Sequence, residues 1–263
     1  MESITSKDNR TLKHVLSLKQ RKYRNKHKEY LVEGFRGVHD LVLRNRVRTI
    51  LVKASLVDTE EVQALLALDK PIIAFAVADE LFASVEDTVT GQGIIGIAKQ
   101  MNGDLGAFKG EGGLYILLDG VQDPGNAGTI IRTAVAAGAK AIFFTKGCVD
   151  VYNEKTVRSA VSAMSEIDIY THLDDQAVAW LVKEAGLTSY VTTLEDARDY
   201  SQVTYQEASL LVLGNEGNGV RPEIQALCHN RIHIPLYGPI ESLNVGIAAA
   251  LAMYKVREQW TKA

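Results

Sequence analysis

The stretch LDGVQDPGNAGTIIR, residues Leu118 to Arg132, joins a short apolar run to a helical pattern. The preceding residues, from Leu114, are continuously apolar, which is typical of a parallel strand buried on both faces. Pro124, Gly125 and Gly128 allow a tight backbone, and the N-terminus of the following helix suits an anion. Ligands of open α/β sheets bind where strands end, so this loop is the first candidate site.

Strands and helices alternate on both sides of this stretch. Downstream, strands are predicted at 141–144, 189–191, 210–213 and 231–235, and helices at 127–137, after the N-cap Asn153, at 174–185 and at 245–260. Upstream, strands are predicted at 30–33, 49–52, 71–75 and 93–98, and helices at 35–43, 58–68 and 79–83. We therefore predict an α/β protein with a small α/β domain over 1–98 and a parallel-sheet domain over 114–263. The glycine-rich segment 99–113 is predicted to link them.

Two further loops follow predicted strands and carry polar side chains. Leu213 to Gly219, LGNEGNG, places three glycines around Glu216, and Ile234 to Val245 places Ser242 and Asn244 just before the last helix. The glycine spacing differs from that of dinucleotide-binding loops, and the sequence contains no P-loop motif. Glycine-rich turns and helix caps are also common as purely structural features, so each loop alone leaves both interpretations open.

Charge is distributed unevenly along the chain. The net charge of −3 combines a balance of +8 over Lys7 to Lys28 with −11 over the remainder. Tyr23, His14 and His27 lie among these cations, a mixture that suits RNA phosphates and exposed bases. The predicted RNA contacts are Lys19, Arg21, Lys22, Arg24, Lys26 and Lys28. A solvated helix face is the alternative.

Several classes of protein and site are disfavoured. No apolar run is long enough to cross a bilayer or resembles a secretion signal, so a cytoplasmic protein without membrane partners is expected. Cys148 and Cys228 form no CxxC pair, and His229 and His233 lack a third ligand, so no metal site is predicted.

Taken together, the three loops resemble the motifs of the SpoU/TrmH family of SPOUT methyltransferases. The matching residues are Asn126-Ala-Gly with Arg132, Leu213-Gly-Asn-Glu216-Gly, and Ile234-Pro with Ser242-Leu-Asn244-Val. GFRGVHDLV at 34–42 and GQGIIGIA at 91–98 are similar to the ribosomal-protein-like substrate-binding domain of many members. The resemblance implies a deep trefoil knot in the C-terminal domain and a homodimer, whose interface would cover the apolar last helix.

The resemblance also implies an activity: transfer of methyl from S-adenosylmethionine to a ribose 2′-hydroxyl, in ribosomal RNA rather than transfer RNA. It assigns catalytic roles to Arg132, Asn126, Glu216, Ser242 and Asn244, and cofactor contacts to Leu213, Gly214, Ile234, Leu236, Leu243 and Asn244. Because arginine stays protonated below pH about 12, we expect Arg132 to stabilise the developing alkoxide, oriented by a pair with Glu216. Replacing Gly214 with Trp is expected to remove cofactor binding without unfolding.

Two alternatives remain open. The chain could bind RNA without catalysis, as an assembly factor that uses its basic segment and front domain. It could also methylate a base nitrogen, as other SPOUT enzymes do. The first motif, Asn126 to Arg132, favours the ribose because it belongs to the 2′-O branch of the family.

Overall fold

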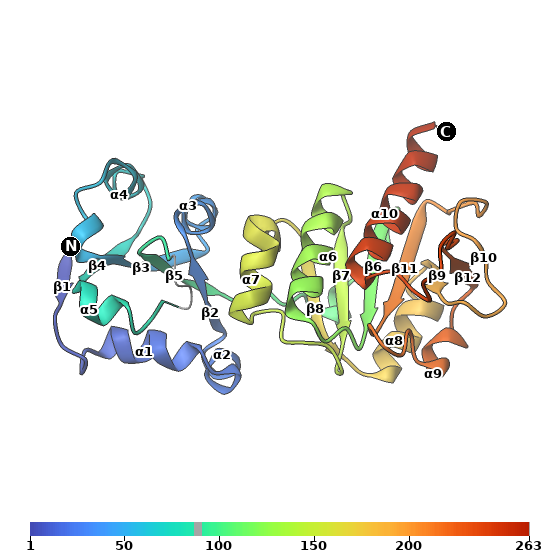
Figure 1. Ribbon diagram of the computed structural model, residues 1–263, viewed down its shortest axis with the longest axis horizontal. Coiled ribbons are helices and arrows are strands. Elements are labelled where there is room, and N and C mark those ends of the chain that lie inside the picture. Colours follow the sequence, from blue (N-terminus) through green and yellow to red (C-terminus); the bar gives the residue numbers. More distant parts are fainter. Residues whose placement is uncertain (87–90, 263) are drawn as a thin grey trace. The chain divides into compact units, whose positions relative to one another are not determined.

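The strands of the described residues form two sheets (Figure 1). The computed structural model describes residues 1–86 and 91–262. Contacts divide the chain into two compact units, residues 1–100 with 152–165, and residues 101–151 with those from 166 onward. The helix α7 (Glu154–Ala160), capped by Asn153 as predicted, therefore packs in the first unit although its sequence lies within the second.

The first unit contains a five-stranded mixed sheet. Its strands in spatial order are β1 (Glu2–Ile4), β4 (Ile73–Val77), β3 (Val47–Lys53), β5 (Ile94–Lys99) and β2 (Glu29–Glu33). β5 runs antiparallel to both of its neighbours, and the other pairs are parallel. Besides α7, its helices are α1 (Arg10–Leu18), α2 (Arg21–His27), α3 (Phe35–Leu43), α4 (Glu60–Leu66) and α5 (Asp79–Phe82).

The basic segment folds onto this sheet. Asn9 caps α1 by accepting hydrogen bonds from the N–H groups of Thr11 and Leu12, and Leu12, Val15 and Leu18 enter the core. These three apolar residues are spaced for one side of a helix, so the opposite side of α1 carries the polar residues. The segment is thus a pair of helices rather than a free arm.

Arg24 corrects one of the predicted RNA contacts. Its side chain is 3% exposed, and its guanidinium donates to the carbonyl oxygens of Leu18 at 2.9 Å and Lys19 at 2.7 Å. These carbonyls lie at the end of α1, where helical partners are missing. Arg24 therefore joins α2 to α1 and is not available to a phosphate.

The second unit contains a seven-stranded sheet in which every pair is parallel. In spatial order its strands are β10 (Arg198–Asp199), β12 (Asn230–His233), β9 (Thr188–Thr192), β11 (Ala208–Gly214), β6 (Gly113–Asp119), β7 (Ala141–Thr145) and β8 (Asp168–Leu173). The predicted parallel sheet is confirmed. The chain moves from β6 outward to β8 and then returns to the other side, so β6 and β11 meet at a switch in strand order.

Helices cover both faces of this sheet (Figure 1). α8 (Asp175–Lys183) and α9 (Pro222–Gln225) contribute Val178, Leu181 and Ile224 to a core that includes Leu117 and Val212. α6 (Pro124–Ala136) and α10 (Val245–Lys262) pack against one another, and α10 also contacts β11. Because side chains alternate along a strand, both faces of these strands are apolar and buried.

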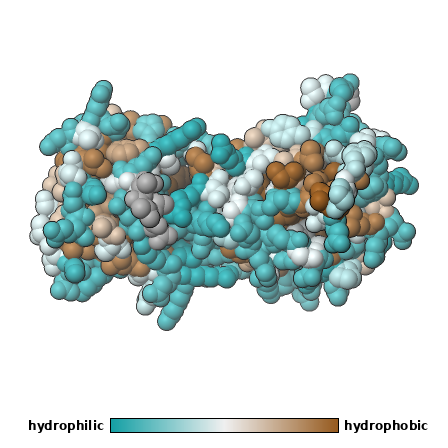
Figure 2. Space-filling model, viewed as in Figure 1, coloured by the Kyte–Doolittle hydropathy of each residue, from teal (hydrophilic) through white to brown (hydrophobic). Residues whose placement is uncertain are grey.

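α10 is apolar beyond the face that it buries. Ala249, Ala252 and Met253 are fully buried, whereas Ile247, Leu251 and Tyr254 are 53%, 40% and 53% exposed. Figure 2 shows apolar residues gathered over the first part of this helix. No helix within residues 1–86 and 91–262 is long and apolar enough to cross a membrane.

We expect Arg24→Met to lower the free energy of unfolding by about 1 to 3 kcal/mol, because two carbonyls at the end of α1 lose their buried donor. Urea denaturation measures this change. Lys26→Met is the matched control, since Lys26 is exposed on the same helix, and its change should stay within about 0.5 kcal/mol. Equal stability of the two variants would show that the Arg24 contacts contribute nothing.

Candidate active site

The loops after β6 and β11 begin side by side, because Gly214 pairs with Asp119 at the ends of these strands. Gly214 leaves no room for a side chain: a Cβ there would lie 2.0 Å from the carbonyl carbon of Gly219 and 2.1 Å from the nitrogen of Val220. The expectation that Gly214→Trp spares the fold is therefore wrong, because the substitution displaces the backbone of the returning loop.

The loop after β11 is a tight turn. Asn215 and Gly219 exchange both of their backbone hydrogen bonds, at 2.9 and 3.0 Å. The Oδ1 atom of Asn215 accepts from the N–H groups of Gly217 and Asn218, and its Nδ2 atom donates to the carbonyl of Gly120 at 2.8 Å. Asn215 thus both shapes this turn and attaches it to the loop after β6.

Glu216, at the tip of the turn, binds the neighbouring loop through both carboxylate oxygens. They accept hydrogen bonds from the N–H groups of Gln122 at 3.2 Å and Asp123 at 3.1 Å, and from Nδ2 of Asn126 at 3.0 Å. Partial burial raises the pKa of Glu216, but the hydrogen bonds from Asn126 and from backbone N–H groups outweigh it and lower the pKa below its ordinary 4.5. The carboxylate is therefore charged at neutral pH and is used to hold the loop.

Asn126 connects this pair of loops to the third. Its Oδ1 atom accepts from Nδ2 of Asn244 at 2.9 Å. Asn244 in turn caps α10, because its Oδ1 atom accepts from the N–H groups of Gly246 and Ile247. A continuous chain of hydrogen bonds, Glu216 to Asn126 to Asn244, thus brings together the three loops that the sequence singled out.

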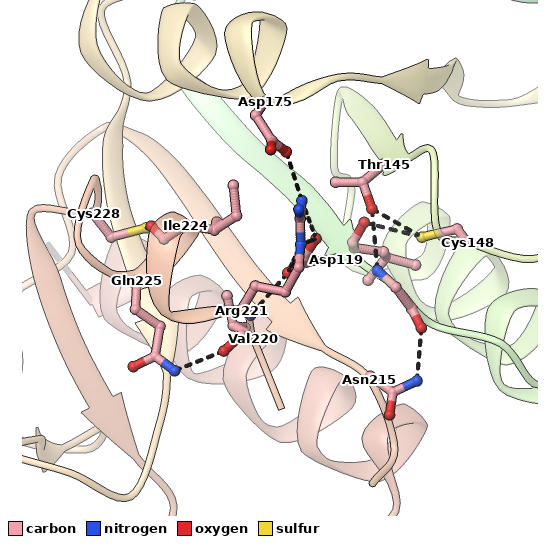
Figure 3. Close-up of polar contacts among 12 residues, drawn as sticks. Asp119, Thr145, Cys148, Asp175, Asn215, Val220, Arg221, Ile224, Gln225 and Cys228 are labelled. Atoms are coloured by element: carbon pink, nitrogen blue, oxygen red, sulfur yellow. Dashed lines mark hydrogen bonds and ion pairs between the residues drawn. The ribbon is translucent and has the colours of Figure 1, made fainter. Parts of the chain in front are cut away.

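An ion-pair network that the sequence analysis missed lies at the base of the same loops (Figure 3). Asp119, 1% exposed, accepts from the backbone N–H of Arg221 at 2.9 Å and from its Nε at 3.0 Å. The guanidinium also binds Asp175, at the start of α8, at 2.8 Å. A carboxylate at the end of a fully apolar strand was the available signal, since such a charge requires a partner when buried.

Arg132 and Ser242 stay outside these networks. Arg132, on α6, is exposed and makes no hydrogen bond or ion pair with the residues that the structure describes. The expected pair between Glu216 and Arg132 is therefore wrong, because the oxygens of Glu216 are occupied by the loop after β6. Ser242 is likewise exposed and forms no hydrogen bond within the described part of the chain.

Asn244, one of the predicted cofactor residues, belongs to the hydrogen-bonded chain described above, and the other five fall into two groups. Ile234, Leu236 and Leu243 line one hollow of about 450 Å³. Its other lining residues are Asp199, Tyr200, Ser201, Pro235, Tyr237, Ile240 and Leu251. Leu213 is 1% exposed and Gly214 is also buried, and neither lines this hollow. The hollow is mostly apolar and has the size of a small-molecule site.

The remaining predicted RNA contacts gather on and around α2. Arg21, Lys22, Lys26 and Lys28 are exposed. Lys19 is partly buried, and its Nζ approaches the carbonyl of Glu86 at 3.5 Å. Five of the six predicted cations therefore keep some access to a ligand, and Arg24 does not.

Comparison with known proteins identifies the family. The model of the SpoU rRNA methylase family matches residues 113–254, which is more than half of the chain. The chain belongs to the SpoU rRNA methylase family. A second model, that of the MRM3-like substrate-binding domain, matches residues 9–96.

Relatives and solved structures agree with this membership. The chain is 33% identical over 258 residues to the 23S rRNA (guanosine(2553)-2′-O)-methyltransferase RlmP of Bacillus subtilis, covering 98% of this chain and all of that protein. A tRNA (guanosine(18)-2′-O)-methyltransferase of Thermus thermophilus is 36% identical over 154 residues, 57% of this chain and 77% of its own length. The AdoMet-bound rRNA methyltransferase of Sinorhizobium meliloti superposes with a TM-score of 0.86 at 28% identity, covering 98% of this chain and 97% of that one. The SPOUT fold expected from the motifs is confirmed.

Glu216→Gln should reduce stability in a pH-dependent way, because the amide replaces an acceptor by a donor facing N–H groups. We expect a loss of about 1 to 3 kcal/mol in the free energy of unfolding at pH 7. A carboxylate with a lowered pKa stabilises the fold above its unfolded pKa and loses this contribution as the pH falls through its folded pKa. The difference in free energy of unfolding between wild type and Glu216→Gln should therefore shrink below pH 4.5, the ordinary pKa of a glutamate side chain.

Denaturant titrations between neutral and acidic pH test this expectation. Glu223→Gln serves as the control, since Glu223 is exposed on α9 and has no partner among the described residues. If the free energies of unfolding of wild type and Glu216→Gln differ by the same amount at every pH, the charged carboxylate of Glu216 does not stabilise the fold.

Proposed function

We propose that the chain transfers a methyl group from S-adenosylmethionine to a ribose 2′-hydroxyl of ribosomal RNA. The observation that carries the proposal is the hydrogen-bonded chain Glu216–Asn126–Asn244, which joins the three family motifs beside an apolar hollow. In this proposal residues 114–263 catalyse the transfer, apart from residues 152–165, which pack in the first unit; residues 1–98 bind the RNA, and 99–113 link the two parts. The names of the RlmP relative and of the AdoMet-bound structure support both the reaction and the cofactor.

The residues of the hollow suit this cofactor in size and chemistry. A volume of about 450 Å³ lies within the usual range for a nucleoside-sized ligand. Ile234, Leu236 and Leu243 would hold it between apolar walls and main-chain groups. Leu213 and Gly214 do not line this hollow, and their contacts with the cofactor stay a prediction. When bound, the cofactor supplies an electrophilic methyl group on a sulfonium.

The protein's task is then to place and activate a hydroxyl. Displacement at the methyl carbon requires the ribose oxygen opposite the leaving sulfur, so positioning carries much of the rate. The guanidinium of Arg132, which has no partner among the described residues, can stabilise the alkoxide as the hydroxyl gives its proton to water, and can bind an RNA phosphate. Asn126 and Asn244, fixed by Glu216, hold the loops that define this geometry. Ser242 remains a predicted contributor on the third loop.

Ribosomal RNA is the substrate favoured by the first unit. The relative named for 23S rRNA matches essentially the full chain, whereas the tRNA enzyme matches only 57% of it. The exposed cations of α2 add a surface for the phosphate backbone. We place this activity in the cytoplasm, as the bacterial ribosomal-RNA relative suggests.

A homodimer is part of the proposal. Ile247, Leu251 and Tyr254 recur at helical spacing on the exposed side of α10, and Tyr237 and Ile240 extend this apolar surface at 96% and 56% exposure. A second copy of the chain would cover it, as large exposed apolar patches mark interaction sites. The trefoil knot implied by the family stays a prediction.

Arg132→Ala should lower kcat by orders of magnitude and leave the affinity for S-adenosylmethionine nearly intact, because it removes an interaction made mainly in the transition state.

Neutral replacements of Lys19, Arg21, Lys22, Lys26 and Lys28 should act differently. They should weaken RNA binding. The slope of log binding constant against log salt concentration should become shallower by roughly one or less per lost phosphate contact. Turnover should recover at saturating RNA.

Single-turnover methylation at several RNA and salt concentrations separates these effects, and calorimetry measures cofactor affinity. Nuclease digestion and mass spectrometry locate the methyl group, and a methylated base would overturn the ribose assignment. No cofactor binding at millimolar concentration would favour a non-catalytic RNA-binding protein. Normal turnover by Arg132→Ala would contradict its catalytic role.

We expect Ile247→Glu with Tyr254→Glu to convert a dimer to monomers, because two charges would be placed in an apolar interface. Sedimentation at micromolar concentration measures the mass. Thr261→Glu, an exposed substitution near the end of the same helix, should remain dimeric. A wild-type monomer under these conditions would contradict the proposed dimer.

A further inference from the structure

Two aromatic rings lie together among the cations of α2. Tyr23 and His27 are four residues apart and therefore share one side of the helix. Their rings are nearly parallel, at 17°, with centroids 6.4 Å apart. Offset aromatic pairs usually have centroids about 4.5 to 7 Å apart, and this pair lies toward the wide end of that range. The two rings consequently cover little of one another.

The position of His27 is supported from α1. The ring of His14 meets it edge-on, at 88° and a centroid distance of 4.9 Å. His14 is itself held by Glu29, whose Oε2 lies 2.6 Å from its Nε2. His27 is exposed and Tyr23 is partly buried, and within the described chain neither side chain makes a hydrogen bond. Aromatic surface and polar edges are thus both available to a ligand.

The surrounding charge identifies the kind of ligand. Lys22 places its Nζ over the Tyr23 ring, 5.8 Å from the centroid, and Arg21, Lys26 and Lys28 are exposed nearby on the chain. Aromatic rings flanked by cations bind single-stranded nucleic acid, since bases stack on the rings while cations contact phosphates. Bases within an RNA duplex are already stacked and paired and do not reach such rings.

We propose that Tyr23 and His27 form a stacking platform for an unpaired RNA base. The inference rests on the proposed role of α2 in RNA binding and adds a structural preference to it: a loop, bulge or single strand is bound in preference to a duplex. Charge alone would give no such preference, because both forms of RNA present phosphates. The platform therefore selects the form of the substrate, and the cations supply affinity.

The test compares two probes: a short unstructured RNA oligonucleotide, and the same oligonucleotide in a blunt duplex. Fluorescence anisotropy measures affinities for wild type, Tyr23→Leu, Tyr23→Phe and His27→Leu. Tyr23→Leu and His27→Leu should each weaken single-strand binding by roughly five- to a hundredfold, the usual effect of losing one stacked base. Duplex binding and the salt slope should stay unchanged, because no phosphate contact is lost. Tyr23→Phe should retain the affinity of wild type.

Asn25→Leu is the matched control, an exposed position on the same helix, and thermal melting confirms that each variant folds. Equal losses on both probes, or none on the single strand, would overturn the platform. So would weak binding by Tyr23→Phe, which keeps the ring, or by Asn25→Leu. A wild type that binds neither probe would also overturn it. No cofactor enters this assay, so a failure of the methylation proposal would leave these affinities unchanged and is measured separately.

Discussion

The carboxylate of Glu216 is the contact on which the arrangement of the site depends. It lies at the tip of one loop and accepts hydrogen bonds from N–H groups of another, which is 90 to 94 residues away in sequence. Each oxygen satisfies donors near the start of α6, where backbone N–H groups lack helical partners. The same contact orients Asn126, and through it Asn244 and the start of α10. One charged side chain thus sets the relation of three loops.

That contact is possible only because β6 and β11 are neighbours in register. Their pairing places Asp119 beside Gly214, so the two loops leave the sheet at the same edge. Gly214 lets the returning backbone approach within a distance that a Cβ would block. Arg221 then neutralises buried Asp119 and ties the loop to α8. Steric room and charge pairing therefore act at the same point of the fold.

In the first unit, folding decides which cations can serve a ligand. Arg24 lies within the same basic run as Lys22 and Lys26, yet its guanidinium completes the hydrogen bonds of α1. The neighbouring residues extend into solvent because α2 turns only one side toward the core. The result is a smaller cationic surface than the sequence predicts, organised around Tyr23 and His27.

Local patterns in the sequence were sufficient for most elements of the fold. Apolar runs predicted the parallel sheet, because this signal depends on near neighbours along the chain. Asn126, Glu216 and Asn244 were assigned to the site by the resemblance of their loops to the family motifs, since each loop alone is also explained as a turn or a helix cap. The helices α1, α2 and α9, the strands β1, β8 and β10, and the network of Asp119 with Arg221 were not predicted. These elements are stabilised by partners that are distant in sequence. The charge of an arginine, in addition, does not reveal whether its side chain faces a carbonyl, a carboxylate or water. Tertiary structure therefore decided that Glu216 binds a loop rather than Arg132, because backbone donors brought close by strand register already occupy its oxygens.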